Sequence, residues 1–151
     1  MQRDALASLD LPRQVLLQLE SHDGLYGAAH EIESAFTNLL VNGLKYTPPE
    51  GTVTMRWWTD EEGAYFSVTD TGIGIPAEHI PRITERFYRV DAGRSRDQGG
   101  SGLGLAIVKH ALQRHSGWLD VKSAVGKGST FTCHFPHQRI WNLAMREAAH
   151  A

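Results

Sequence analysis

The chain has almost no cysteine and no long apolar run. Cys133 is its one cysteine among 151 residues, so neither an intrachain disulfide nor a cysteine-based zinc site can form. No apolar stretch approaches the ~20 residues that a membrane-spanning helix needs, and the first residues lack the apolar core of a signal peptide. These absences predict a soluble, cytosolic domain.

A strong charge of either sign is also missing. The 15 lysines and arginines nearly balance 17 aspartates and glutamates, which gives a formal net charge of -2. This balance argues against bulk electrostatic capture of nucleic acid or anionic lipid. The eight histidines show no spacing such as H-x-x-x-H, so their pattern does not suggest a metal site.

The pattern of apolar residues predicts alternating strands and helices. We expect strands at 15–20, 52–58, 64–70, 118–123 and 129–135, helices at 28–46, 104–115 and 140–149, and short helical pieces at 77–87. This order predicts a two-layer α/β sandwich, with a mixed sheet of about five strands covered on one face by about three helices. We expect a linker remnant at 1–14, one domain at 15–137 and a C-terminal tail at 138–151.

The helix predicted at 28–46 carries an unusual polar stripe. On a helical wheel, Asn38, Asn42 and Lys45 share a face with Glu31, opposite an apolar stripe. A solvated surface is the ordinary interpretation, but asparagine is a poor choice for a solvated helical face. An asparagine oxygen is a neutral ligand for Mg²⁺, and lysine neutralises phosphate. The alternative interpretation is therefore a site for a metal-bound phosphate compound.

Glycine is abundant, and seven of the 15 glycines lie between positions 72 and 104. The first cluster, residues 70–74 (DTGIG), is either a plain turn or a place where the backbone approaches a flat ligand closely. In the second case, the carboxylate of Asp70 accepts a hydrogen bond from an exocyclic amine such as that of adenine. The cluster is not a phosphate P-loop or a Rossmann fingerprint, because the P-loop pattern and a following βαβ unit are both absent.

The second glycine cluster, residues 99–105 (GGSGLGL), leads into the helix predicted at 104–115. Such a loop is either a flexible linker with a cap, or an anion site where backbone N–H groups and the positive helix end meet the ligand. Five of the 15 basic residues lie between positions 82 and 96, all of them arginines. Arginine suits polyphosphates because its guanidinium donates two hydrogen bonds at once. We expect residues 89–102 to form a long mobile loop.

The order and spacing of four segments are more specific than any single one. Residues 38–48 (NLLVNGLKYTP), 70–75 (DTGIGI), 85–91 (ERFYRVD) and 100–105 (GSGLGL) resemble the N, G1, F and G2 boxes of sensor histidine kinases. The resemblance spans about 15–136 and is to their catalytic ATP-binding domain, which is related to the gyrase, Hsp90 and MutL ATPases. It implies the Bergerat-type fold of that superfamily. Residues 84–91, 99–102 and 106–110 are most similar to phosphate-regulon sensor kinases.

The resemblance implies a role for each matched residue on the phosphate side. Asn42 would hold Mg²⁺ through its side-chain oxygen, and Asn38 would stand beside the metal and the phosphates. Lys45 and Arg89 would contact the phosphates, and residues 91–102 would form a lid. One departure is mild: Gly43 stands where alanine is usual, at a cost of ~1 kcal/mol in helix propensity.

On the adenine side, the resemblance implies that Tyr46 covers the ring and that Asp70 accepts from N6, directly or through water. Gly72 and Gly74 would give room for the base. The remaining nucleotide-contacting positions would be Ile75, Tyr88, Gly100, Ser101, Gly102, Leu103, Gly104 and Leu105, with the glycines of the last box wrapping the triphosphate.

The resemblance implies a kinase that binds Mg²⁺ and ATP and phosphorylates a histidine on a separate dimerisation domain. The usual setting of that histidine, HELRTP, is absent, and His30 is interpreted as a surface residue. The implied partner is a response regulator, in a pathway that senses phosphate limitation through an inner-membrane sensor. The alternatives are an ATPase of the same superfamily, which would carry glutamate at position 38 as a base, and a silent nucleotide-binding module.

Overall fold

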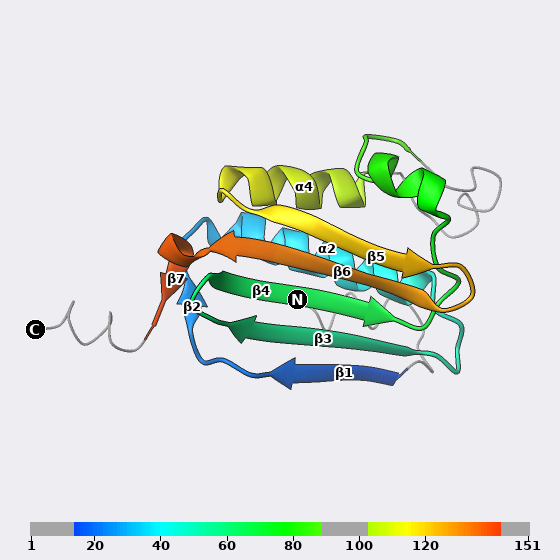
Figure 1. The fold of residues 1–151 in the computed structure, drawn as a ribbon, viewed down its shortest axis with the longest axis horizontal. Coiled ribbons are helices and arrows are strands. Elements are labelled where there is room, and N and C mark those ends of the chain that lie inside the picture. Colours follow the sequence, from blue (N-terminus) through cyan, green and yellow to red (C-terminus); the bar gives the residue numbers. More distant parts are fainter. Residues whose placement is uncertain (1–13, 89–102, 143–151) are drawn as a thin grey trace, which may run out of the picture.

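The computed structural model describes residues 14–88 and 103–142, in which a five-stranded sheet forms one layer (Figure 1). The strand order is β1-β3-β4-β6-β5. The strands are β1 (Gln14–Leu19), β3 (Thr52–Thr59), β4 (Gly63–Asp70), β5 (Trp118–Ala124) and β6 (Gly128–Pro136). Strand β1 runs parallel to β3 and the other neighbours are antiparallel, so the sheet is mixed as predicted.

Helices α2 (Ala29–Lys45) and α4 (Gly104–Arg114) lie side by side on one face of this sheet (Figure 1). Helix α2 packs on β3 and β4, and α4 packs on β5 and β6. The short 3₁₀ helix η1 (Ala77–Arg82) lies between β4 and the start of α4 in the chain. The two-layer α/β sandwich expected from the sequence is therefore confirmed.

Helix α2 buries an apolar face that includes a glycine. Its buried residues are Ala35, Leu39, Leu40, Gly43 and Leu44. A Cβ on Gly43 would lie 3.2 Å from Cγ1 of Val68 on β4, which is tighter than an ordinary contact. Gly43 thus lets the helix approach the sheet closely, a packing reason that helix propensity alone does not reveal.

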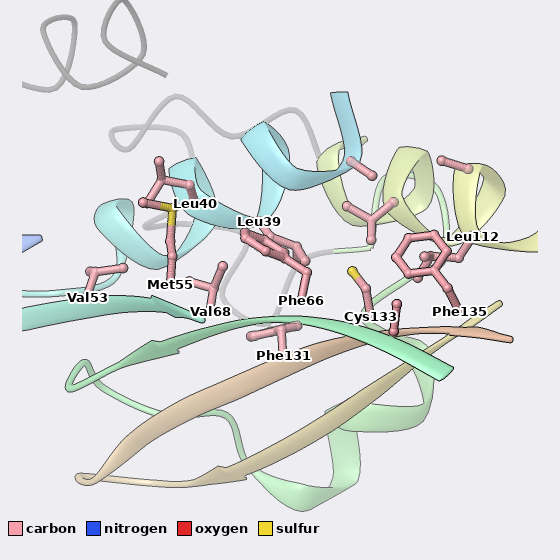
Figure 2. Packing of buried hydrophobic residues seen from close by; sticks show 14 of the residues in the cluster. Leu39, Leu40, Val53, Met55, Phe66, Val68, Leu112, Phe131, Cys133 and Phe135 are labelled. Atoms are coloured by element: carbon pink, nitrogen blue, oxygen red, sulfur yellow. The ribbon is translucent and has the colours of Figure 1, made fainter. Parts of the chain in front are cut away.

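Aromatic rings join the two layers at the centre of the core. Phe36 of α2 stacks on Phe66 of β4, with ring centroids 4.0 Å apart, and meets the edge of Phe135 of β6 at 6.1 Å. Figure 2 shows the surrounding cluster, with labelled Leu39, Leu40, Val53, Met55, Val68, Leu112, Phe131 and Cys133. Directional ring packing of this kind fixes the position of α2 over β4.

The C-terminal part of the described chain differs from the expectation. Residues Ile140–Trp141 form strand β7, which pairs antiparallel with β2 (Gly24–Leu25), after the short 3₁₀ helix η2 (His137–Arg139). The helix predicted at 140–149 is therefore wrong at its start, because buried Ile140 gains more from pairing with Leu25 than an isolated short helix offers. Residues 143–149 of that range, and the loop predicted at 89–102, lie outside the described residues.

Candidate functional site

Asp70 ends the central strand β4 and is almost fully buried, with 5% of its surface exposed. Its Oδ1 accepts hydrogen bonds from the backbone N–H of Gly72 at 2.9 Å and of Ser129 at 3.3 Å. Burial raises the pKa of this carboxyl, and the two backbone hydrogen bonds partly oppose that rise. Among the described residues, no donor reaches Oδ2, so one oxygen is fixed and the other is left for a ligand.

The two glycines after Asp70 are required by the protein's own backbone. A Cβ on Gly72 would lie 2.2 Å from the carbonyl oxygen of Tyr46, and one on Gly74 would lie 2.1 Å from that of Ala124. Gly74 also has a φ of +76°, which L side chains rarely adopt. The structure thus supplies an internal reason for both glycines, and their role in giving room to a base stays a prediction.

The turn at 72–75 is fastened on both sides. The N–H of Ile73 donates to the carbonyl oxygen of Tyr46 at 3.3 Å, and the carbonyl oxygen of Ile73 accepts from Gly126 at 2.8 Å. The N–H of Ile75 donates to Oγ of Ser123 on β5 at 2.7 Å. The turn therefore joins the end of α2 to the β5–β6 hairpin, which holds it in one conformation.

The predicted polar stripe of α2 is not a fully solvated face. Asn38, Asn42, Lys45 and Tyr46 are all half-buried. Nδ2 of Asn38 donates to the carbonyl oxygen of Ser34 at 2.8 Å, which orients the amide and leaves Oδ1 free of that bond. Within residues 14–88 and 103–142, the side chains of Asn42 and Lys45 have no hydrogen-bond or ion-pair partner.

The start of α4 meets this stripe. A Cβ on Gly104 would lie 3.1 Å from Oδ1 of Asn38, so glycine at this position lets the start of the helix approach the amide closely. No side chain caps the helix at Leu103, whose carbonyl accepts from Ile107 at 3.0 Å. The first-turn N–H groups therefore point out of the helix without an intrahelical acceptor. Leu105 packs against the hydrophobic core and anchors this turn.

Tyr88 is placed by a separate cluster. Its hydroxyl shares a hydrogen bond with Nδ1 of His79, and the guanidinium of Arg82 lies 4.6 Å from the centre of its ring. Arg82 also pairs with Glu85 at 3.1 Å. None of these contacts reaches Asn42 or Asp70. Tyr88 packs against the hydrophobic core, as Ile75 and Leu105 do, and its contact with a nucleotide stays a prediction.

The structure adds residues that the sequence did not indicate, and leaves some predicted ones outside its range. Ser129 contributes a backbone N–H to Asp70, which only the pairing of β4 with β6 reveals. Ser34 precedes Asn38 by four positions, and this spacing was an available clue. Four predicted positions, Arg89, Gly100, Ser101 and Gly102, lie outside the described residues.

Comparison with known proteins places this arrangement in a family. Residues 27–139 match the family described as "Histidine kinase-, DNA gyrase B-, and HSP90-like ATPase". The chain therefore belongs to the histidine kinase-, gyrase B- and HSP90-like ATPases. It is 60% identical over 116 residues to the phosphate regulon sensor protein PhoR of Pseudomonas aeruginosa. The matched residues cover 77% of this chain and 26% of that protein. The chain thus spans about a quarter of that relative.

Solved structures agree with this assignment. The mycobacterial sensor histidine kinase MprB superposes with a TM-score of 0.76 at 30% identity, covering 89% of this chain and 92% of that one. Full-length ShkA, solved in complex with AMPPNP, superposes with a TM-score of 0.74 at 25% identity, covering 89% of this chain and 29% of that one.

Several predictions from the sequence are thereby confirmed. The resemblance to the catalytic domain of sensor histidine kinases holds, and so does the nearer similarity to a phosphate-regulon sensor. Domains of the matched family bind ATP. In the part of the chain that the structure describes, no helix has the length and apolar character needed to cross a membrane.

Proposed function

We propose that this domain binds Mg²⁺ and ATP and transfers the γ-phosphoryl group to a histidine on a separate dimerisation and phosphoacceptor domain. The observation that supports this most directly is the closeness of Asn38 Oδ1 to the start of α4, where a Cβ on Gly104 would lie 3.1 Å from it. Half-buried amide oxygens beside uncapped helical N–H groups suit a metal-bound polyphosphate. Asp70, packed beside Gly43 of the same helix with one oxygen open, suits the exocyclic amine of adenine.

The donor atoms of α2 fit magnesium. Mg²⁺ takes oxygen ligands and usually combines one or two protein ligands with waters and substrate phosphates. Asn42 offers a side-chain oxygen that no described residue occupies, and Asn38 offers a second one nearby on the same face. Mg²⁺ held by these residues would supply positive charge that offsets the negative charge of the phosphates. Lys45, in the last turn of α2, would add a positive charge on the same side.

The adenine end depends on residues that are already oriented. The Gly72 and Ser129 N–H groups hold Oδ1 of Asp70, so Oδ2 keeps one direction for an incoming N–H donor. Tyr46, whose carbonyl fastens the turn, would cover the ring with its side chain, and Ile75 would line the same pocket. Tyr88, Leu103, Leu105 and the positions from Arg89 to Gly102 complete the proposed nucleotide contacts.

The residue at position 38 favours a kinase over a hydrolysing ATPase. Water activation needs a base, and the amide of Asn38 cannot take a proton. Its Nδ2 is already committed to the carbonyl of Ser34. The domain would therefore bind and orient ATP but leave the choice of acceptor to a histidine brought in line from outside. Exposed His30, in the first turn of α2, is not proposed as that acceptor.

The biological setting is proposed from the relatives. Identity of 60% to a phosphate regulon sensor protein supports a role in a two-component pathway that responds to phosphate limitation. In that setting the phosphohistidine would pass its phosphoryl group to a response regulator. The domain would belong to an inner-membrane sensor protein, with residues 15–137 as the catalytic unit.

The test mixes the chain with γ-labelled ATP and with the dimerisation and phosphoacceptor domain of the phosphate-regulon relative, which is called the hairpin below. The proposal expects label on the hairpin that is acid-labile and base-stable, as a phosphohistidine is. The Asn42→Ala variant should lose this transfer, whereas Gln113→Ala on the exposed face of α4 should retain it. Rapid ATP hydrolysis by the chain alone, with no labelled hairpin, would contradict the proposal in favour of the ATPase.

A further inference from the structure

His115 is a buried residue to which the proposed site assigns no role. It follows the last residue of α4 and is 3% exposed. Its Nδ1 lies 2.7 Å from the carbonyl oxygen of Ala111, and its Nε2 lies 3.0 Å from the backbone nitrogen of Ala28. A carbonyl only accepts and a backbone N–H only donates, so the ring must carry its proton on Nδ1 and accept on Nε2.

This ring joins the end of one helix to the beginning of the other. Ala28 is the residue before α2, and its carbonyl accepts from Glu31 and Ile32 in the first turn, both at 3.0 Å. No side chain of α2 caps this end of the helix. The imidazole of His115, directly after α4, therefore holds the peptide from which α2 starts.

A second close approach, between Gly27 and the ring of His115, also fixes the position of the ring. A Cβ on Gly27 would lie 2.4 Å from Cδ2 and 2.5 Å from Nε2 of His115, so the chain passes directly against the ring. Glu31 and Arg114 form an ion pair across the same junction, but Arg114 is 57% exposed, and exposed pairs add little. The buried hydrogen bonds and the Gly27 contact fix the junction.

The two helices run antiparallel, so the end of α4 opposite His115 lies at the proposed phosphate site. His115 meets Ala28 at one end of α4, and Gly104 lies beside Asn38 at the other. The 11 residues of α4 span about 16 Å at ~1.5 Å per residue. Between the ends, buried Val108, Ala111 and Leu112 make apolar contacts, which are non-directional and tolerate sliding.

We propose that His115 is a positioning residue that sets the axial position of α4 against α2, and so the placement of Gly104 beside Asn38. The inference rests on the proposed nucleotide site for its functional consequence. A rigid helix transmits a shift at its end to its beginning, so loss of the His115 hydrogen bonds displaces the first-turn N–H groups from the phosphates. Asp70 lies on the sheet and is not moved by this shift.

The test compares His115→Leu, which removes both hydrogen bonds, with His115→Gln, whose amide oxygen can still accept from Ala28. Calorimetry at a temperature where every variant is folded measures the affinity for Mg²⁺-ATP and, separately, for adenosine. We expect His115→Leu to weaken the binding of Mg²⁺-ATP about threefold to tenfold, because one or two hydrogen bonds are lost. His115→Gln should recover much of the loss, and adenosine affinity should not change.

Three controls separate positioning from a general loss of stability. Cys133→Ala, buried on β6, should lower the melting temperature without changing the ratio of ATP to adenosine affinity. Arg114→Ala should change little, because its ion pair is exposed. Gly27→Ala should weaken ATP binding by pushing the ring, and it should do so less in the His115→Leu background, where the contact of the new Cβ with Cδ1 of Ile32, at 2.8 Å, remains but the ring is gone.

A readout without nucleotide tests the same inference if ATP binding itself fails. The NMR signals of the Asn38 side-chain amide and the Gly104 backbone amide should shift in His115→Leu and stay in place in Cys133→Ala. If the wild-type chain binds no nucleotide but His115→Leu still shows these shifts, only the proposed function is refuted. Unmoved signals, or equal loss of ATP and adenosine affinity in His115→Leu, would overturn the positioning role.

Discussion

The two ends of the proposed site are built differently. At the adenine end, Asp70 and the 72–75 turn are held by backbone hydrogen bonds and by glycines that no other residue can replace. At the phosphate end, Asn42 and Lys45 are half-buried side chains without partners among the described residues. At the adenine end the chain itself supplies the hydrogen-bond partners, whereas at the phosphate end a charged ligand would supply them.

This difference separates folding from binding. Residues at the adenine end serve both, because the turn that orients Asp70 also joins α2 to the β5–β6 hairpin. Residues at the phosphate end are free to serve binding alone. Changes at the first end should therefore affect stability and changes at the second should affect ligand affinity, with Asp70 as an informative exception.

The largest effect is expected for Gly72→Ala. The new Cβ would lie 2.2 Å from the Tyr46 carbonyl oxygen, so the backbone must move, at a cost of about 3 kcal/mol in the free energy of unfolding. Urea denaturation measures it. Gly126→Ala is the matched control: its Cβ would meet nothing within 4 Å, so only the strain of its φ of +81°, ~1 kcal/mol, remains. Equal losses in both variants would contradict the account.

Asp70→Asn should weaken nucleotide binding by roughly 10- to 100-fold, because a hydrogen bond to a charged group contributes about 1.5–3 kcal/mol. The asparagine oxygen can still accept from Gly72 and Ser129, and no buried charge remains, so stability at neutral pH should not fall. Calorimetry measures the nucleotide affinity, and thermal melting measures the stability. Asp120→Asn on β5 is the isosteric control and should leave nucleotide affinity unchanged.

Asn38→Glu should increase ATP hydrolysis severalfold, because a carboxylate at this position supplies the base that the amide lacks. Asn38→Gln has the same length without a base and should not increase it. Steady-state phosphate release by the purified chain measures both. An increase in both variants, or in neither, would contradict the role assigned to position 38.

The smallest expected effect is a pH dependence that comes from Asp70. Burial raises its pKa above the ordinary value of 3.8, so the folded chain binds this proton more tightly than the unfolded chain. The stability of the wild type relative to Asp70→Asn should therefore fall as pH rises from below 3.8 through the raised pKa. Urea melts of both proteins across this range measure the relative stability, and a wild type that gains stability relative to Asp70→Asn as pH rises would contradict the assignment.

The sequence predicted the elements and the four boxes because both depend on local patterns. The apolar stripe of α2 and the alternation along β4 were visible as periodicities, and the boxes as spacing. The sequence could not predict β7, because a two-residue strand exists only where Ile140 meets Leu25 across the fold. The Ser129 N–H at Asp70 and the His115 junction were missed for the same reason: each joins residues far apart in the chain.

The glycines show a subtler limit. Gly72 and Gly74 were expected to give room to a base, and the structure shows that carbonyl groups of the chain itself already exclude a Cβ at both positions. Their role beside a base stays a prediction. A glycine in sequence signals that a side chain is not tolerated, but not whether a ligand or the protein is the reason.

Calorimetry of the wild-type chain with three ligand mixtures tests the contrast between the two ends most directly: ATP with Mg²⁺, ATP with EDTA, and adenosine. The account predicts that Mg²⁺ strengthens ATP binding about tenfold or more, that adenosine binding is indifferent to EDTA, and that Asn42→Ala removes the Mg²⁺ effect while keeping adenosine affinity. Equal ATP affinity with Mg²⁺ and with EDTA, or an unchanged Mg²⁺ effect in Asn42→Ala, would contradict it.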